Sequence, residues 1–327
     1  MTVQVQTRPW LQLGCQAEAE VARFDVAGAG CASIDEFLYV DASLSDDKGR
    51  VLAQEQQPGG NIATALVAAA GLGARVGFAG RLSDRDEGAI VRADFAAHGV
   101  DLTFALSDPQ ARPIRATIVV YKDGERFIAY DDVTTVGLSP GDDVTALRQA
   151  RVVLLDKYAL APAVAALGTA RNEVMIVADV EAEVDWAALQ QVQHLVLPMA
   201  AARQLSGESD PTAILNLLWS DRRAAVVVTD GGHGVWFRDG TGPDCQYQPA
   251  FDVPVVDTTG CGDVFHGAYA VALARGLDVA DCVRFAAAAG AICATGRGGR
   301  GRLPTDRTID QIVRGELDLS DGDPQSG

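Results

Sequence analysis

Asp263 lies in the segment of the sequence best suited to chemistry. Residues 255–267 have the sequence VVDTTGCGDVFHG, which predicts a strand ending at Val256, a glycine turn and a helix that begins near Gly262. The first N–H groups of a helix lack partners within it and the dipole is positive there, so such a turn binds anions. A carboxylate in it suits the removal of a proton from a hydroxyl that attacks a phosphoryl group. The alternative is an Asp that only caps the helix.

Two ordered signatures resemble those of the ribokinase-like (PfkB-type) carbohydrate kinases. Residues 257–263, DTTGCGD, resemble the C-terminal signature, and Gly59-Gly60-Asn61 with GRLSD at 80–84 resembles the N-terminal one. The resemblance runs from about residue 23 to about residue 310. It implies an α/β fold with three layers, in which helices flank a central mostly parallel sheet, together with a small β-sheet lid over the sugar.

The resemblance also implies a role for individual residues. Asp263 corresponds to the catalytic base, and the backbone of Gly260, Cys261 and Gly262 to an anion hole for the γ-phosphate. The implied sugar-binding residues are Asp35, Gly59, Gly60 and Asn61. The implied nucleotide-binding residues are Thr229, Gly231, Gly234, Thr259, Gly298 and Gly299. Local structure offers an alternative at each place: a turn Asp, an Asn helix cap, an ordinary turn and a solvated glycine-arginine loop.

The cofactors that the resemblance implies are ATP and Mg²⁺, with K⁺ as a further candidate. Many members of the family carry an Asn-x-x-Glu motif that helps to hold the hydration shell of Mg²⁺. The corresponding stretch here is Pro198-Met-Ala-Ala201, which has neither residue. Mg²⁺ would then be held mainly by ATP phosphates, waters and other side chains, and the sequence identifies no metal ligand.

The region around the C-terminal signature narrows the expected substrate. Residues 248–268, followed by Arg284-Phe285 and Gly298-Gly-Arg300, look most like the branch that holds ketohexokinases and sulfofructose kinases, and the likeness to sulfofructose kinases is closest around residues 256–270. This resemblance favours a ketohexose, or a derivative of one, that is phosphorylated at a primary hydroxyl. Residues 108–113, DPQARP, match no sulfonate site, so the exact sugar stays open.

The elements that must position these residues change in character along the chain. From residue 151 short apolar runs alternate with helical stretches, which predicts a parallel sheet covered on both faces. Residues 36–57 and 112–131, with a hairpin around Asp123-Gly124, break this rhythm and predict the lid. We expect an N-terminal extension over 1–22, a kinase domain over 23–315 and a tail over 316–327. The lid's apolar face predicts a homodimer.

Composition excludes several classes of partner. The formal net charge of −17 over 327 residues repels phosphate backbones, so nucleic acid is a poor partner. No apolar run is long enough to cross a bilayer, and the first twenty residues lack a basic segment followed by an apolar core. The six cysteines are scattered and the four histidines show no metal-ligand spacing, which predicts a protein of the reducing cytoplasm.

Two rival functions remain at this point. Gly28-x-Gly30 after a strand suggests a nicotinamide oxidoreductase, but Ser33 stands where the dinucleotide fingerprint needs a third glycine. A non-catalytic sugar-binding protein on a kinase fold is the second rival, because a fold does not determine a function. Retention of Asp263 argues against it. No P-loop phosphate-binding motif occurs in the chain.

Overall fold

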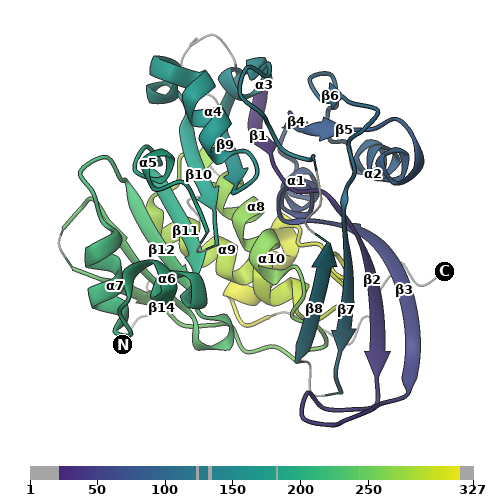
Figure 1. Ribbon diagram of the computed structural model, residues 1–327. Helices are drawn as coiled ribbons and strands as arrows, with labels where there is room; N and C mark the ends of the chain where they lie inside the picture. The colour runs from purple at the N-terminus through teal and green to yellow at the C-terminus, as the bar shows by residue number, and fades with distance from the viewer. Residues whose placement is uncertain (1–21, 123–124, 132–134, 182, 243, 317–327) are drawn as a thin grey trace.

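The computed structural model describes residues 22–122, 125–131, 135–181, 183–242 and 244–316. A large sheet carries helices on both faces, and a smaller sheet projects beside it (Figure 1). This arrangement confirms the predicted fold class. The predicted extension over 1–22 and tail over 316–327 lie almost wholly outside the described residues, so the domain boundaries stay a prediction.

The main sheet has eight strands in the order β14-β13-β12-β11-β10-β9-β1-β4. The strands from β12 to β4 run parallel, and β13 and β14 form an antiparallel edge. Their bounds are β1 Phe24–Ala29, β4 Val76–Phe78, β9 Ala150–Asp156, β10 Met175–Asp179, β11 His194–Pro198, β12 Ala225–Thr229, β13 Val235–Asp239 and β14 Gln246–Gln248.

Continuous apolar strands bury both faces of this sheet. In β9, Val152 and Leu154 join one core, whereas Val153 and Leu155 join the other, because successive side chains point to opposite faces. The first core includes α1 (Asn61–Gly71), α2 (Asp86–Ala97), α8 (Cys261–Ala274), α9 (Val279–Cys293) and α10 (Asp306–Val313). The second includes α3 (Thr145–Arg148), α4 (Leu160–Leu167), α5 (Trp186–Leu189), α6 (Met199–Ser206) and α7 (Pro211–Leu218).

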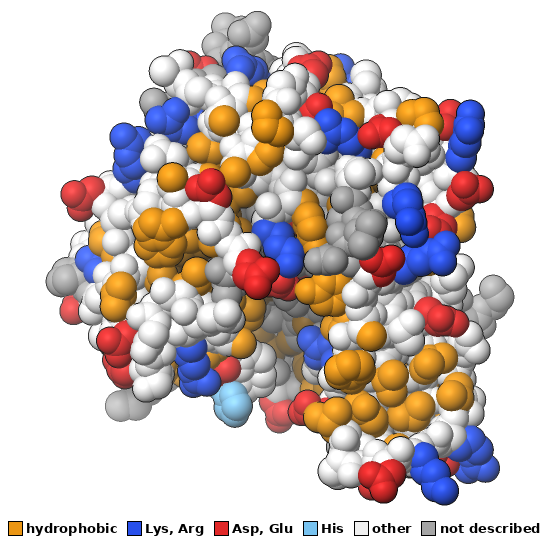
Figure 2. Space-filling view, in the orientation of Figure 1, with side chains coloured by type: hydrophobic (Ala, Val, Ile, Leu, Met, Phe, Trp, Pro, Cys, Tyr) orange, Lys and Arg blue, Asp and Glu red, His pale blue; other side chains and the backbone are white. Residues whose placement is uncertain are grey.

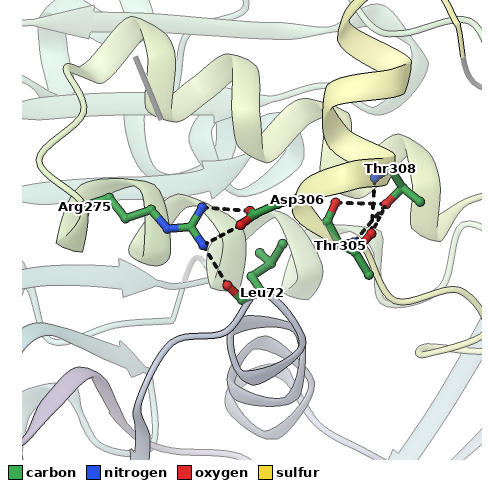
Figure 3. Close-up of polar contacts among 5 residues, drawn as sticks. All are labelled: Leu72, Arg275, Thr305, Asp306 and Thr308. Carbon is green, nitrogen blue, oxygen red and sulfur yellow. Dashed lines mark hydrogen bonds and ion pairs between the residues drawn. The ribbon is translucent and has the colours of Figure 1, made fainter. Parts of the chain in front are cut away.

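Polar contacts hold the ends of three helices together on the first face (Figure 3). Arg275, just after α8, donates to both carboxylate oxygens of Asp306 at 2.8 and 3.1 Å and to the carbonyl of Leu72, just after α1, at 2.7 Å. Thr305 caps α10 through reciprocal hydrogen bonds with Thr308. These contacts fix α8, whose opposite end carries Asp263.

The lid is the four-stranded sheet β3-β2-β7-β8. Its strands are β2 (Ser33–Val40), β3 (Val51–Gly59), β7 (Ile114–Val120) and β8 (Arg126–Asp131). β7 and β8 pair antiparallel, as expected of the hairpin, while β2 pairs parallel with β7. A small apolar cluster with Phe37 and Ile118 holds it together. A short parallel pair, β5 (Arg81–Leu82) and β6 (Leu106–Ser107), lies apart from it.

One predicted strand is wrong. Residues 251–256 form no strand, and Val255 and Val256 are 57% and 45% exposed. The backbone N–H of Val256 instead donates to the carbonyl of Ala294 at 2.8 Å, just beyond α9. The apolar run is thus extended, but it is anchored to a helix end and not to the sheet. Among the described residues, no helix is both long and apolar enough to cross a membrane.

Candidate active site

A cavity of about 390 Å³ lies between the lid and the ends of the main-sheet strands. Parallel strands present their carboxyl ends at one edge, which is where ligands bind in open α/β sheets. Of the residues proposed from sequence, those that line it are Asp35, Gly60, Asn61, Thr229, Thr259, Gly260, Gly262 and Asp263. Those that do not are Gly59, Cys261, Gly231, Gly234, Gly298 and Gly299.

The turn before α8 is shaped by its glycines. Gly260 has φ +74°, and a Cβ there would lie 2.3 Å from the carbonyl oxygen of Gly299. Gly262, in contrast, has no atom within 4 Å of the place where its Cβ would lie, apart from its chain neighbours and the backbone of its own helix. Position 260 therefore requires glycine for its backbone conformation and packing. Gly262 leaves open space through which an anion can reach the backbone at the start of α8.

Asp257 ties this turn to its neighbours. It is fully buried, and its carboxylate accepts hydrogen bonds from the backbone N–H of Thr259 at 2.8 Å and of Gly298 at 2.9 Å. The hydroxyl of Tyr39, on the lid strand β2, lies 3.4 Å from the same carboxylate. Arg126 of β8 donates to the hydroxyl of Thr258. Two of the four lid strands, β2 and β8, thus contact the turn directly.

The sugar-side residues meet at the start of α1. Asp35 is buried on β2 and accepts a hydrogen bond from the Ser33 hydroxyl at 2.6 Å. A Cβ at Gly59 would lie 1.9 Å from the Asp35 carboxylate, and Gly60 has φ +95°. Gly59 thus lies directly behind Asp35, while Gly60 and Asn61 face the cavity. The Asn61 side chain hydrogen-bonds the carboxylate of Asp179.

The residues proposed for the nucleotide lie on two sides of the α8 turn. Thr229 ends β12 and faces the cavity. Gly231 begins the following 3-10 turn and Gly234 directly follows it, and neither lines the cavity. Gly299 packs behind Gly260. Of the six residues proposed for the nucleotide, Thr229 and Thr259 line the cavity, and the four glycines do not.

Several site residues were missed from the sequence. Asp156 and Asp179 end β9 and β10, and both line the cavity together with Lys157, Glu181 and His266. Lys157 and Glu181 form an ion pair of 2.9 Å. An acidic residue at the end of each apolar run, in LLD at 154–156 and VAD at 177–179, was the available signal. Parallel strands bring such ends together.

Burial raises the pKa of carboxyl groups that line the cavity. Asp156 accepts hydrogen bonds from the backbone N–H of Cys31 at 2.6 Å and of Tyr158 at 2.9 Å, and burial raises its pKa to about 7. Burial also raises the pKa of Asp263 well above its ordinary value, and the negative charges of Asp179 and Asp35 raise it further. Such a carboxylate is a stronger base than an exposed Asp.

The glycines that suggested a dinucleotide site have another explanation. A Cβ at Gly28 would lie 2.9 Å from the Ile62 side chain on α1, and one at Gly30 would lie 2.3 Å from the Asp156 carboxylate. Both glycines make room for side chains of this chain. Within the described ranges, no group of three or more His, Cys, Asp or Glu side chains could hold a metal ion.

A cavity that joins buried carboxyl and amide side chains to an open glycine turn at a helix start is suited to phosphoryl transfer. The model of the pfkB family carbohydrate kinases matches residues 26–306. The chain belongs to the pfkB family of carbohydrate kinases. The nicotinamide oxidoreductase is thereby excluded, and the predicted resemblance is confirmed.

Known relatives of this carbohydrate kinase span most of its length. Ribokinase of Bacillus subtilis is 27% identical over 279 residues, 78% of this chain and 87% of the relative. The ATP-dependent ribose-1-phosphate kinase of Halopiger xanaduensis is 29% identical and covers 90% of this chain and 99% of its own. A crystal structure of a putative ribokinase from Agrobacterium tumefaciens has a TM-score of 0.76 at 25% identity, covering 90% of this chain and 99% of its own.

The two glycines of the turn should respond differently to Ala. We expect Gly260→Ala to lower the melting temperature, because φ is positive and the methyl would meet Gly299. Gly262→Ala should melt like the wild type, since its Cβ meets nothing, yet lose sugar-kinase activity because the methyl enters the anion site. Thermal melts and activity assays on both variants test this. Equal melting temperatures for the two, with full activity of Gly262→Ala, would contradict it.

Proposed function

We propose that this carbohydrate kinase transfers the γ-phosphoryl group of ATP to a primary hydroxyl of a ketohexose or a ketohexose derivative, with Asp263 as the general base. One observation carries the proposal. Asp263 lines one cavity together with Asp35 and Asn61, which are proposed for the sugar, and with Gly260 and Gly262, which are proposed for the phosphate. A group placed between an acceptor and a phosphate site can take the proton as the phosphoryl group moves.

The proposed roles follow from the position of each group. Asp35 and Asn61 hold sugar hydroxyls, since a carboxylate accepts and an amide both donates and accepts. Asp263 removes the proton of the attacking hydroxyl and keeps it. The backbone of the turn, with the positive end of α8, holds the oxygens of the transferring group. ATP supplies the phosphoryl group when it is bound.

The open space at Gly262 fits a phosphate, which supports ATP as the donor. Solved structures of relatives include a ribokinase of Arabidopsis thaliana complexed with ribose and ATP, and a putative ribokinase II of E. coli in complex with ATP and Mg²⁺. We infer that this chain uses both. Because the described residues contain no three-ligand cluster, Mg²⁺ would enter on the ATP phosphates and keep most of its waters.

A cytoplasmic location completes the proposal. The five cysteines of the described residues are all free thiols. Free thiols that survive in a folded protein fit a reducing compartment. The location does not affect the proposed mechanism.

The nature of the sugar can be tested with a substrate panel. Probable fructokinase-5 of Arabidopsis thaliana, 25% identical over 310 residues, supports a ketohexose, while the relatives named for ribose favour a pentose as the second candidate. We expect ketohexoses, or their sulfo or phospho derivatives, to show the highest kcat/KM by ADP release. A preference of about a hundredfold for ribose or a nucleoside would contradict the ketohexose assignment.

The base can be tested with Asp263→Asn. The amide keeps the shape of the side chain but cannot take a proton, so we expect kcat to fall by about 10²–10⁴-fold. Sugar and ATP binding should persist, because the glycine turn and the helix start remain. Calorimetric titrations, a melt and kcat on one preparation decide the matter. Near-normal turnover would leave Asp263 as a helix cap, and wild type without sugar-dependent ADP release would favour the non-catalytic alternative.

The pH dependence of kcat/KM reports the charges around Asp263. Activity requires its ionised form, so kcat/KM should fall as the pH drops through its raised pKa. Asp179→Asn removes a neighbouring negative charge and should move this acid limb to lower pH. Asp221→Asn, at an exposed position, is the control and should leave the limb unmoved. No difference between the two variants would contradict the electrostatic account.

We also propose a homodimer through the lid. Three large apolar side chains on lid strands that do not line the cavity are 49–61% exposed, namely Val51, Leu52 and Phe127. Figure 2 shows hydrophobic side chains gathered over the lid. β8 also lies at the edge of the sheet and is exposed along its whole length. Apolar edges and faces of this kind are usually covered.

Light scattering at micromolar concentration tests the dimer. We expect twice the chain mass for the wild type and the chain mass for Phe127→Lys, which places a charge on the exposed lid strand. Leu217→Lys, at a position on α7 that is 54% exposed, is the matched control and should stay dimeric. A wild-type monomer, both with and without sugar, would contradict the proposal.

A further inference from the structure

His266 lies beneath the candidate site, one helical turn after Gly262 on α8. It lines the cavity and is only 3% exposed. Its Nδ1 lies 2.7 Å from the carbonyl oxygen of Gly262, and its Nε2 lies 3.1 Å from the carbonyl oxygen of Val196 on β11. Each ring nitrogen thus faces a backbone oxygen, one in the phosphate-binding turn and the other in the main sheet.

These two contacts restrict the state of the imidazole. A carbonyl oxygen only accepts hydrogen bonds, so each ring nitrogen must donate. A neutral imidazole carries one N–H and would leave a nitrogen lone pair against a buried oxygen. Only the imidazolium form satisfies both contacts. The carboxylate of Asp179 on β10 lies 3.6 Å from Nε2 and supplies the opposite charge, and both side chains are buried, at 4% and 8% exposed.

His194 provides a contrast within the same structure. It begins β11, is also 3% exposed, and its Nδ1 lies 3.0 Å from the hydroxyl of Tyr269 on α8. A hydroxyl can donate or accept, so a neutral imidazole satisfies this contact. Burial lowers the pKa of His194 to about 4. Two buried histidines packed against the same helix therefore differ in the partners that they face.

We propose that His266 is a positioning residue: a buried imidazolium that joins the phosphate-binding turn at Gly262 to Asp179, which in turn holds the sugar-side amide of Asn61. On its own helix the nearest ionisable side chains are Asp263, three residues earlier, and Tyr269, three residues later. The cation keeps Asp179 oriented toward Asn61 and adds a positive charge, beside those of Arg126 and Lys157, to the wall of a cavity that is lined by more acidic than basic side chains. The inference deepens the proposed function and rests on it for the roles of Asn61 and the turn.

Nuclear magnetic resonance of the ring nitrogens tests the charge state without any need for turnover. In wild-type protein labelled with ¹⁵N-histidine, at about pH 8 where an ordinary imidazole is neutral, one histidine should show two ring N–H groups. That signal should vanish in His266→Gln. His194 should show a single N–H group or none. A single N–H at His266 at this pH would overturn the proposal, whatever the activity of Asp263→Asn.

Kinetics test the positioning role. We expect His266→Phe to lose about tenfold to a hundredfold in kcat/KM, as for one or two charge-assisted hydrogen bonds. Sugar KM should rise with it, since Asn61 loses its fixed partner. His194→Phe is the matched control, with the same substitution in another buried site, and should lower stability while leaving sugar KM unchanged. Equal kinetic effects of the two variants would reduce His266 to a packing residue.

His266→Gln separates charge from shape if the Phe variant folds poorly. Gln can reach one of the two carbonyl oxygens but carries no charge. A folded His266→Gln protein with raised sugar KM supports the proposal, and one with wild-type KM and kcat overturns it.

Discussion

The buried carboxylate of Asp257 is the interaction on which the site depends. It accepts two backbone N–H groups, from Thr259 and Gly298, and receives the hydroxyl of Tyr39 at longer range. One side chain thereby fixes the turn before α8, the glycine-arginine loop behind it and the inner strand of the lid. These contacts join the lid strand and the glycine-arginine loop, which are far apart in sequence, to the turn, and they act together with the hydrogen bond from Arg126 to Thr258. The turn that we propose as the anion site is therefore held by the lid as well as by the glycine-arginine loop.

The second constraint is electrostatic. Asp35, Asp156, Asp179 and Asp263 line one cavity, and burial raises the pKa of each. Like charges at close range disfavour ionisation, so the cavity needs compensation from cations and from the dipole of α8. Arg126 from the lid and Lys157 from the end of β9 also line the cavity. A site with this balance can hold one carboxylate ready to take a proton and still admit a phosphate.

Local chemistry made some of this predictable. The glycines of residues 257–263 predict the turn and the helix that follows it. The alternation of apolar runs with helical stretches beyond residue 151 predicts the parallel sheet covered on both faces. Residues 36–57 were assigned to the lid, but strand β3 within them was not recognised as a strand, because its sequence is mostly polar. The apolar run before Asp257 suggested a strand that does not form, since sequence cannot show that its partner is a helix end. Asp156 and Asp179 were missed because only the sheet brings them to Asp263. His266 lies three residues after Asp263, but it was missed because its contacts with Val196 and Asp179 on the sheet strands cannot be read from the sequence.

The most direct test of the central claim is a structure of the enzyme with a ketohexose and a non-hydrolysable ATP analogue. The account predicts a carboxylate oxygen of Asp263 within about 2.6–3.2 Å of the reacting sugar hydroxyl, the hydrogen-bond reach of a general base. It also predicts the γ-phosphate analogue on the N–H groups of the turn at Gly260–Gly262. A sugar hydroxyl held far from Asp263 in the closed complex, or a terminal phosphate bound away from this turn, would contradict it.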